Sequence, residues 1–520
     1  MKHCLDLVLS PEDAATKERY LQHIARALKI HPRQITYNKI IRRSVDARRQ
    51  SVKVNIRVLV WHDELPPDEP GNVFTYPDVH GKTEVHIIGA GPGGLFAGLR
   101  LIELGYKPVI LERGKDVKAR RHDIAAIYQQ QQINPDSNFC FGEGGAGTFS
   151  DGKLYTRSKK RGSVQKILEV LHFHGASEDI LIEAHPHIGT NKLPAIVQAL
   201  RGSILAAGGE IHYNSRVEEF LLTNNRLSGI KTQNDTIPVQ QVILAAGHSA
   251  RTLFTMMSAR GITLEAKPFA MGVRVEHPQE LIDRLQYHGS GRGDYLPAAA
   301  YALATQVAGR GVYSFCMCPG GYIVPAATSD MEIVVNGMSS AARHSKYANA
   351  GMVVEIQLCD IPQLDQDSAL AGLQFQQELE QHAKLHGGGG QIAPAQRITD
   401  FVSGRLSQSL PDTSYHPGTS SSPLHEWLPE HIARRLAESF KAFDRRMKGF
   451  LTSEAVILGV ESRTSSPVRI PRNHETLQHI HIANLYPCGE GAGYAGGIVS
   501  SAIDGERCAE AVCKNILQAM

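Results

Sequence analysis

The stretch Val85-His-Ile-Ile-Gly89-Ala-Gly91-Pro-Gly93-Gly94 decides the fold of this 520-residue chain. Its apolar beginning fits a buried parallel strand, and the strand leads directly into a glycine-rich turn. Gly89 permits the tight turn, Gly91 lets the backbone approach a pyrophosphate, and Gly94 lets the next helix pack on the strand. The N–H groups and the positive dipole end of that helix would then face the phosphates.

The residues after the turn continue the same unit. Leu95, Leu99 and Ile102 recur at helical spacing, Gly105 ends the helix, and residues 108–112 form a second apolar strand. That strand ends on Glu112, 18 residues after Gly94, close to the ~20 expected of a carboxylate that binds a ribose. Strand, turn, helix, second strand and acid occur in order, so we predict a Rossmann-type dinucleotide site. The motif alone does not separate NAD from FAD.

Two distant segments favour FAD. Residues 244–247, Leu-Ala-Ala-Gly, close an apolar strand on small residues. Residues 484–490 end another strand, and the glycine loop at 491–498 precedes an amphipathic helix. The start of that helix can aim N–H groups at the pyrimidine edge of a flavin, where negative charge collects on reduction. We therefore expect FAD in a domain built from two separated parts of the chain.

Several longer motifs carry a resemblance to a known family. They are Phe141-Gly-Glu-Gly-Gly-Ala-Gly-Thr-Phe-Ser-Asp-Gly-Lys153 and the stretches at 185–190, 247–251, 268–277, 319–325, 335–339 and 461–469. With them, residues 80 to 510 resemble the largely uncharacterised bacterial FAD-dependent dehydrogenases of the glutathione-reductase-like flavoprotein superfamily. The N-terminal module also resembles the one that precedes the flavin domain there.

The resemblance implies a set of FAD contacts, made by Gly89, Ala90, Gly91, Pro92, Gly93, Gly94, Glu112, Arg113, Val217, Ala246, Gly247, Gly489, Glu490, Gly496, Gly497 and Ile498. The glycine-rich loop with Gly144, Gly145, Ala146 and Gly147 is flexible enough to bring backbone close to the isoalloxazine. Ala246 stands where the superfamily often has a threonine, so a contact there must come from the backbone.

The expected fold class is α/β, with five consecutive segments. They are a basic α+β module of ferredoxin-like form at 1–62, a proline-rich linker at 63–83, the first part of the FAD domain at 84–265, an inserted mixed α+β substrate or cap domain at 266–450, and the C-terminal part of the FAD domain at 451–520. Helices are expected at 116–132, 191–207, 368–385 and 425–448, and a strand at 238–245.

Three residues are candidates for the chemistry. Lys153 follows the glycine-rich loop and is either a hydrogen-bond partner of the reactive flavin nitrogen or a solvated loop residue. Glu461 and Arg463 are polar residues in an otherwise apolar or small stretch. They line a substrate pocket, or they form internal ion pairs that tie two domains together, and we prefer the second interpretation.

Composition limits the function further. Eight cysteines in 520 residues are too few for a disulfide scaffold, and no apolar stretch is long enough for a membrane span, so a cytoplasmic location is expected. The three His-x-His pairs lack the spacing of zinc motifs, so no metal is expected. Residues 1–60 hold 13 Lys and Arg against 5 Asp and Glu.

The function predicted is an FAD-dependent oxidoreductase, a dehydrogenase that passes electrons between a donor, NAD(P)H among the candidates, and a small-molecule acceptor. The alternative is a flavoprotein that docks RNA on its basic module, as in tRNA modification. A solvated basic face is the simpler reading of that charge, because no aromatic residues interleave with it.

Overall fold

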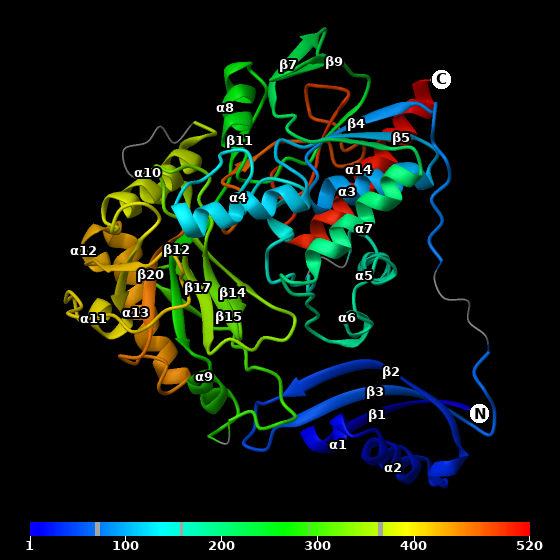
Figure 1. Ribbon diagram of the computed structural model, residues 1–520, viewed down its shortest axis with the longest axis vertical. Helices are drawn as coiled ribbons and strands as arrows, with labels where there is room; N and C mark the ends of the chain where they lie inside the picture. The colour runs from blue at the N-terminus through cyan, green and yellow to red at the C-terminus, as the bar shows by residue number, and fades with distance from the viewer. Residues whose placement is uncertain (68–72, 157–159, 290, 362–367, 520) are drawn as a thin grey trace.

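The structure is a computed structural model that describes residues 1–67, 73–156, 160–289, 291–361 and 368–519. The chain folds into three units, each built around a main sheet (Figure 1). The expected linker at 63–83 contains residues 68–72, which lie outside the described residues. No helix in the described ranges is long and apolar enough to cross a membrane.

The N-terminal module is an antiparallel sheet with two helices on one face. Strands β1 (Lys2–Leu9), β2 (Ile35–Asp46) and β3 (Lys53–His62) pair in the order β1-β3-β2. The helices α1 (Pro11–Ala15) and α2 (Lys17–Leu28) cover Val54, Ile56, Val58 and Val60, which alternate along β3. The ferredoxin-like form is wrong in detail, since such a sheet has four strands and residues 1–67 supply three.

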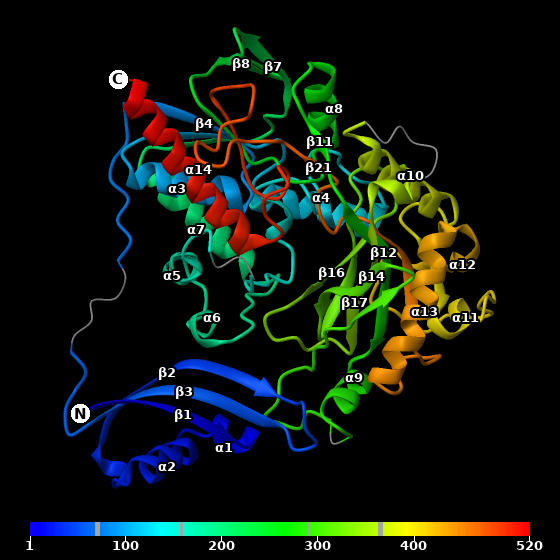
Figure 2. The same cartoon turned by 180° about the vertical axis from the view of Figure 1, so that it is seen from behind.

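The second unit contains a parallel sheet assembled from distant parts of the chain. Its strands, in spatial order, are β22 (Leu485–Pro487), β10 (Val242–Leu244), β4 (Glu84–Ile88), β5 (Lys107–Leu111) and β6 (Glu210–His212). Helices α3 (Pro92–Glu103), α7 (Leu193–Ala206) and α14 (Ile498–Ala519) pack together beside it (Figure 2). The strand order reverses direction at β4, and ligands of such sheets bind at the carboxyl ends of the strands around that point.

The third unit has a seven-stranded mixed sheet. Its order is β13 (Ala304–Val307), β14 (Arg310–Cys318), β17 (Tyr347–Ile356), β12 (Phe269–Pro278), β20 (Val456–Glu461), β18 (Ala393–Arg397) and β19 (Thr419–Ser421). Helices α10 (Ala371–Leu385), α11 (Ile398–Val402), α12 (Leu424–Trp427) and α13 (Glu430–Arg446) gather on one side of it (Figures 1 and 2). The hairpin of β15 (Gly321–Pro325) and β16 (Val335–Ser339) lies beside it.

Three expectations about elements and boundaries were wrong. The expected boundary at residue 450 comes too early, because β20 pairs with β12 and β18 in the seven-stranded sheet. The expected helix at 425–448 is two helices, since Pro429 has no N–H to continue the first one. The expected strand at 238–245 is divided into β9 (Thr236–Pro238), which lies on a small sheet, and β10.

The helices expected at 116–132, 191–207 and 368–385 are present as α4 (Val117–Gln130), α7 and α10. Asp116 caps α4 by accepting the N–H groups of Lys118 and Ala119.

Candidate functional site

The glycine turn after β4 is held by close packing. Gly89 has φ of 100°, and a Cβ atom there would lie 2.5 Å from the carbonyl oxygen of Ala245 at the end of β10. A Cβ atom on Gly94 would overlap the carbonyl oxygen of Gly89. Helix α3 therefore begins directly against the turn, with Gly91 as its N-cap and Pro92 in its first turn. This is the arrangement in which a helix N-terminus can receive a pyrophosphate.

Glu112 connects this turn to the glycine-rich loop. Its buried carboxylate accepts hydrogen bonds from the N–H groups of Ala90 at 2.8 Å, Gly114 at 2.9 Å and Gly142 at 3.0 Å. A carboxylate has about four acceptor sites, so one remains for a ribose hydroxyl. The neighbouring Arg113 lies 3.9 Å from the centre of the Phe141 ring and pairs with Asp136 at 2.6 Å.

A single cleft runs from this turn to the third unit. The expected FAD contacts that line it are Gly89, Gly91, Pro92, Gly93, Glu112, Arg113, Gly145, Ala146, Gly147, Val217, Ala246, Gly247, Gly489, Glu490, Gly496, Gly497 and Ile498. Ala90, Gly94 and Gly144 are not among the lining residues, and they hold the glycine turn and the glycine-rich loop in place behind the lining. Ala90 receives the N–H of Gly144 on its carbonyl oxygen at 2.8 Å.

The lining residues fit a dinucleotide. Cβ atoms on Gly247, Gly496 and Gly497 would meet no atom within 4 Å, so these glycines leave open space along the cleft. Glu490 lies 3.4 Å from His248, so a carboxylate and an imidazole stand together on the lining. The cleft thus offers an N-terminal helix turn for phosphates, carboxylates for hydroxyl groups and an unfilled glycine surface for a ring system.

The far end of the cleft is built by residues of the third unit, of which the sequence had singled out only Arg463 as a site residue. They are Phe315 and Cys316 of β14, Asn336 of β16, and Arg463 and Thr464 just after β20. Ser215 and Arg216, next to Val217, were also missed, although their place just after β6 at the carboxyl edge of the sheet was a usable signal. The cleft is therefore shared by the second and third units.

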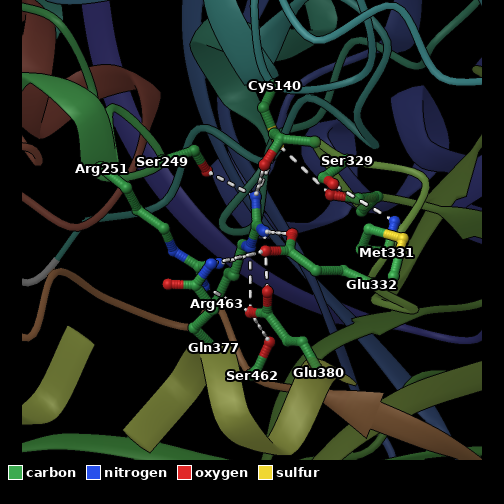
Figure 3. A network of polar contacts seen from close by, with 12 residues as sticks. Cys140, Ser249, Arg251, Ser329, Met331, Glu332, Gln377, Glu380, Ser462 and Arg463 are labelled. Carbon is green, nitrogen blue, oxygen red and sulfur yellow. Dashed lines mark hydrogen bonds and ion pairs between the residues drawn. The ribbon is translucent and has the colours of Figure 1, made fainter. Parts of the chain in front are cut away.

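Arg463 reaches this end of the cleft from a buried ion-pair network (Figure 3). Its Nη2 atom lies 2.9 Å from Glu332 and 2.8 Å from Glu380. Arg251 completes the network with contacts of 2.9 Å to Glu332 and 2.8 Å to Glu380. Burial works against ionisation of Glu380, but the two guanidinium groups lower its pKa to about 2. Burial and the neighbouring Glu380 raise the pKa of Glu332. Two arginines thus meet two buried carboxyl groups, which supports the interpretation of Arg463 as part of an internal network between units.

Glu461 lies in a second buried ion pair, away from the cleft lining. Its carboxylate is 2.6 Å from Nη1 of Arg274, and Arg274 also donates from Nε to Asn349 at 2.8 Å. Burial raises the pKa of Glu461 to about 7, and Arg274 offsets part of that rise. The structure thus places Glu461 among internal contacts of the seven-stranded sheet.

Lys153 does not line the cleft either. Its ammonium lies 3.0 Å from Asp151, 3.5 Å from the sulfur of Cys316 and 3.3 Å from the sulfur of Cys318. Lys153 therefore contacts the sulfurs of Cys316 and Cys318 and does not border the open cleft. Of these two cysteines, only Cys316 lines the cleft.

One group of side chains in the described ranges has the composition of a metal site. Cys488, Asp504 and Cys508 place their ligand atoms within 4.8 Å of one another. Arg472 already occupies this cluster, with contacts of 2.6 and 2.9 Å to Asp504 and 3.5 Å to the sulfur of Cys508. A guanidinium supplies the positive charge that a cation would bring, so we assign no metal here.

Comparisons with known proteins bear on the cofactor. A family model described as "FAD-dependent protein, C-terminal domain-like" matches residues 268–464, and a model of a domain of unknown function matches residues 1–61. Together with the dinucleotide cleft, the first match defines the class: this is a flavoprotein of the oxidoreductase type, with FAD as its cofactor.

A protein of Clostridium beijerinckii described as uncharacterised is 39% identical in an alignment 508 residues long that covers 94% of each chain. The chain belongs to the same family as that protein. Among solved structures, glycine oxidase from Bacillus cereus aligns with 84% of this chain and 96% of its own, at 13% identity and a TM-score of 0.32. CtdE in complex with FAD aligns with 84% of this chain and 88% of its own, at 12% identity and a TM-score of 0.31. Neither likeness is close enough to carry an argument.

Proposed function

We propose that this protein is a dehydrogenase that passes electrons between a donor, NAD(P)H being the first candidate, and a small-molecule acceptor. The observation that carries the proposal is the single cleft, which begins at the turn after β4 and ends on β14, β16 and the segment after β20. The second unit supplies the nucleotide-binding end, and the third unit supplies the walls against which a substrate would lie.

The work of the chain is to bind and orient. FAD, when bound, supplies the redox chemistry itself, so no nucleophile of the protein is required. Gly89 to Gly94 and Glu112 would hold the nucleotide half. Gly496 and Gly497 lead into α14, which begins at Ile498, and the N-terminus of this helix would face the flavin half. Asn336 offers an uncharged amide at the far end, where Arg463 shares Glu332 and Glu380 with Arg251.

This charge balance bears on the class of substrate. An arginine paired with Glu332 and Glu380 presents little net charge to a ligand, so the far end of the cleft favours a neutral or weakly polar molecule over a strongly anionic one.

The proposal is tested by mixing the oxidised holoprotein with NADH or NADPH without oxygen and following the flavin absorption band. We expect one of the two nucleotides to bleach the band within seconds to minutes. If neither does, the pyridine-nucleotide version is contradicted, and the electrons must come from the substrate itself.

The basic module does not support a second function. Arg43 pairs with Glu183 of the second unit at 2.6 Å, and Arg57 pairs with Asp6 at 2.8 Å. The carbonyl oxygen of Ala47 accepts a hydrogen bond from the imidazole of His288 of the third unit at 2.8 Å. Part of the charge and of the surface of this module is therefore used within the chain, and we propose no role in binding RNA.

A further inference from the structure

Two cysteines stand at an irregular point of strand β14. The pairing of β14 with β17 shifts register between Phe315 and Cys318, and Cys316 within this bulge has φ of 46°. A bulge re-aims side chains, and a positive φ is costly for a residue other than glycine. As a result, Cys316 lines the far end of the cleft, half-buried, while Cys318 is fully buried behind it.

The two cysteines share a hydrogen bond and two neighbouring cations. The thiol of Cys318 donates to the carbonyl oxygen of Cys316 at 3.3 Å. Lys153 contacts both sulfurs, at 3.5 and 3.3 Å, and Arg274 donates to the carbonyl oxygen of Cys316 at 2.7 Å and lies 3.6 Å from the sulfur of Cys318.

The anions around the pair are already matched. Asp151 accepts contacts from Lys153 at 3.0 Å and from Arg343 at 3.2 Å, and Glu461 pairs with Arg274. A bound metal ion is disfavoured at these sulfurs, because the ammonium of Lys153 lies where a cation would bind.

This environment makes the two thiols unequal. The neighbouring side chain of Cys318 lowers the pKa of Cys316 despite its burial, and the charges of Lys153 and Arg274 lower it further. The side chain of Cys316 and burial raise the pKa of Cys318. A thiolate beside a protonated thiol is the resting form expected of a pair that opens and closes a disulfide.

We propose that Cys316 and Cys318 are a redox-active dithiol–disulfide pair that exchanges two electrons with the FAD of the same cleft. This rests on the proposed function, because FAD is the electron partner. On oxidation the two sulfurs join, the S–H bond of Cys318 breaks, and two electrons and that one proton pass to FAD. On reduction the same electrons and proton return, and the S–S bond breaks.

The direct test is a reductive titration of the holoprotein, oxidised with diamide and desalted, with dithionite under anaerobic conditions. The wild type should consume two molar equivalents of dithionite per chain, each supplying two electrons, one equivalent for FAD and one for the disulfide. Cys316→Ser and Cys318→Ser should each consume one. Cys359→Ser is the matched control, because Cys359 is exposed and lies outside the cleft lining, and it should behave as the wild type. A wild type that consumes one equivalent would overturn the proposal.

A second measurement does not depend on FAD or on the folding of variants. Cleavage after Arg310 and Arg343 releases a peptide whose only cysteines are Cys316 and Cys318. After oxidation this peptide should be lighter by two hydrogen atoms, and free thiols in it would contradict the pair. A protein without a flavin absorption band would contradict the proposed function instead, so the two failures are distinguishable.

Lys153 has the role of a positioning residue in this account. In Lys153→Met, the pH profile of Cys316 alkylation by iodoacetamide should shift to higher pH, with slower alkylation than in the wild type below its midpoint, because the ammonium no longer favours the thiolate. Lys153→Arg should keep the wild-type rate. Equal rates in Lys153→Met and the wild type would show that Lys153 does not hold the thiolate.

Discussion

The ion-pair network behind Arg463 is the most direct place to test how the second and third units are held together. Glu380 is fully buried on α10 and accepts from both Arg251 and Arg463 (Figure 3). Glu380→Gln keeps the volume of the side chain and removes its charge. The guanidinium groups of Arg251 and Arg463 would then share the single carboxylate of Glu332.

Breaking a buried ion pair by removing one partner costs about 3–5 kcal/mol, because the remaining charge is left uncompensated. Glutamine keeps one acceptor oxygen, so we expect about 3 kcal/mol for Glu380→Gln, at the lower end of that range. Glu378→Gln is the matched control: it lies two residues away on the same helix, and its side chain is exposed. A surface change of this kind stays within about 0.5 kcal/mol.

Urea denaturation, followed by fluorescence, measures both variants. Trp427 lies on α12 in the third unit and reports on that unit, while Trp61 reports on the N-terminal module. The reasoning is refuted if Glu380→Gln is as stable as Glu378→Gln. It is also refuted if Glu380→Gln changes substrate affinity alone, since Arg463 would then be a substrate-binding residue.

Two further predictions concern the turn and a buried imidazole. Gly94→Ala should lower FAD affinity about tenfold or more, because the new methyl group overlaps the carbonyl of Gly89 and overpacking costs about 1–3 kcal/mol. Gly202→Ala on α7, which meets no atom within 4 Å, should leave the FAD content unchanged, and the opposite ranking would contradict the assigned turn. Burial lowers the pKa of His277 to about 4 from 6.5, so the folded state binds fewer protons between these values and loses stability as the pH falls through them. Between pH 7 and pH 5 this amounts to about 2 kcal/mol in denaturation measurements. His277→Gln should lose that part of the slope, His474→Gln, on an exposed residue, should keep it, and equal slopes in both would count against the assignment.

The nucleotide-binding half was predictable because its signals are local. Gly89, Gly94 and Glu112 stand at spacings set by one strand, one turn and one helix, and each lies where the spacing places it. The strand at 485–487 was also predictable, because its apolar residues and the glycines after it repeat the pattern of a strand followed by a glycine turn.

The third unit was not predictable in the same way. Cys316 reaches the cleft through a bulge that depends on pairing between β14 and β17. No local sequence signal predicts this bulge. Arg463 pairs with Glu332 and Glu380, which are 131 and 83 residues away in sequence. Its ion-pair partners are therefore identified only in the folded chain. Pro429, in contrast, was a local signal for the break between α12 and α13 that the periodicity of the apolar residues concealed.

The central claim is that FAD occupies the cleft along its glycine surface. It is tested most directly by the amount of FAD that the protein retains after saturation and desalting, in the wild type and in Gly497→Val. A valine there projects into space that now holds no protein atom within 4 Å, so the fold should tolerate it. The account predicts one FAD per wild-type chain and a small fraction of that in Gly497→Val, with the same far-ultraviolet circular dichroism. Equal FAD contents in two folded proteins would contradict the account.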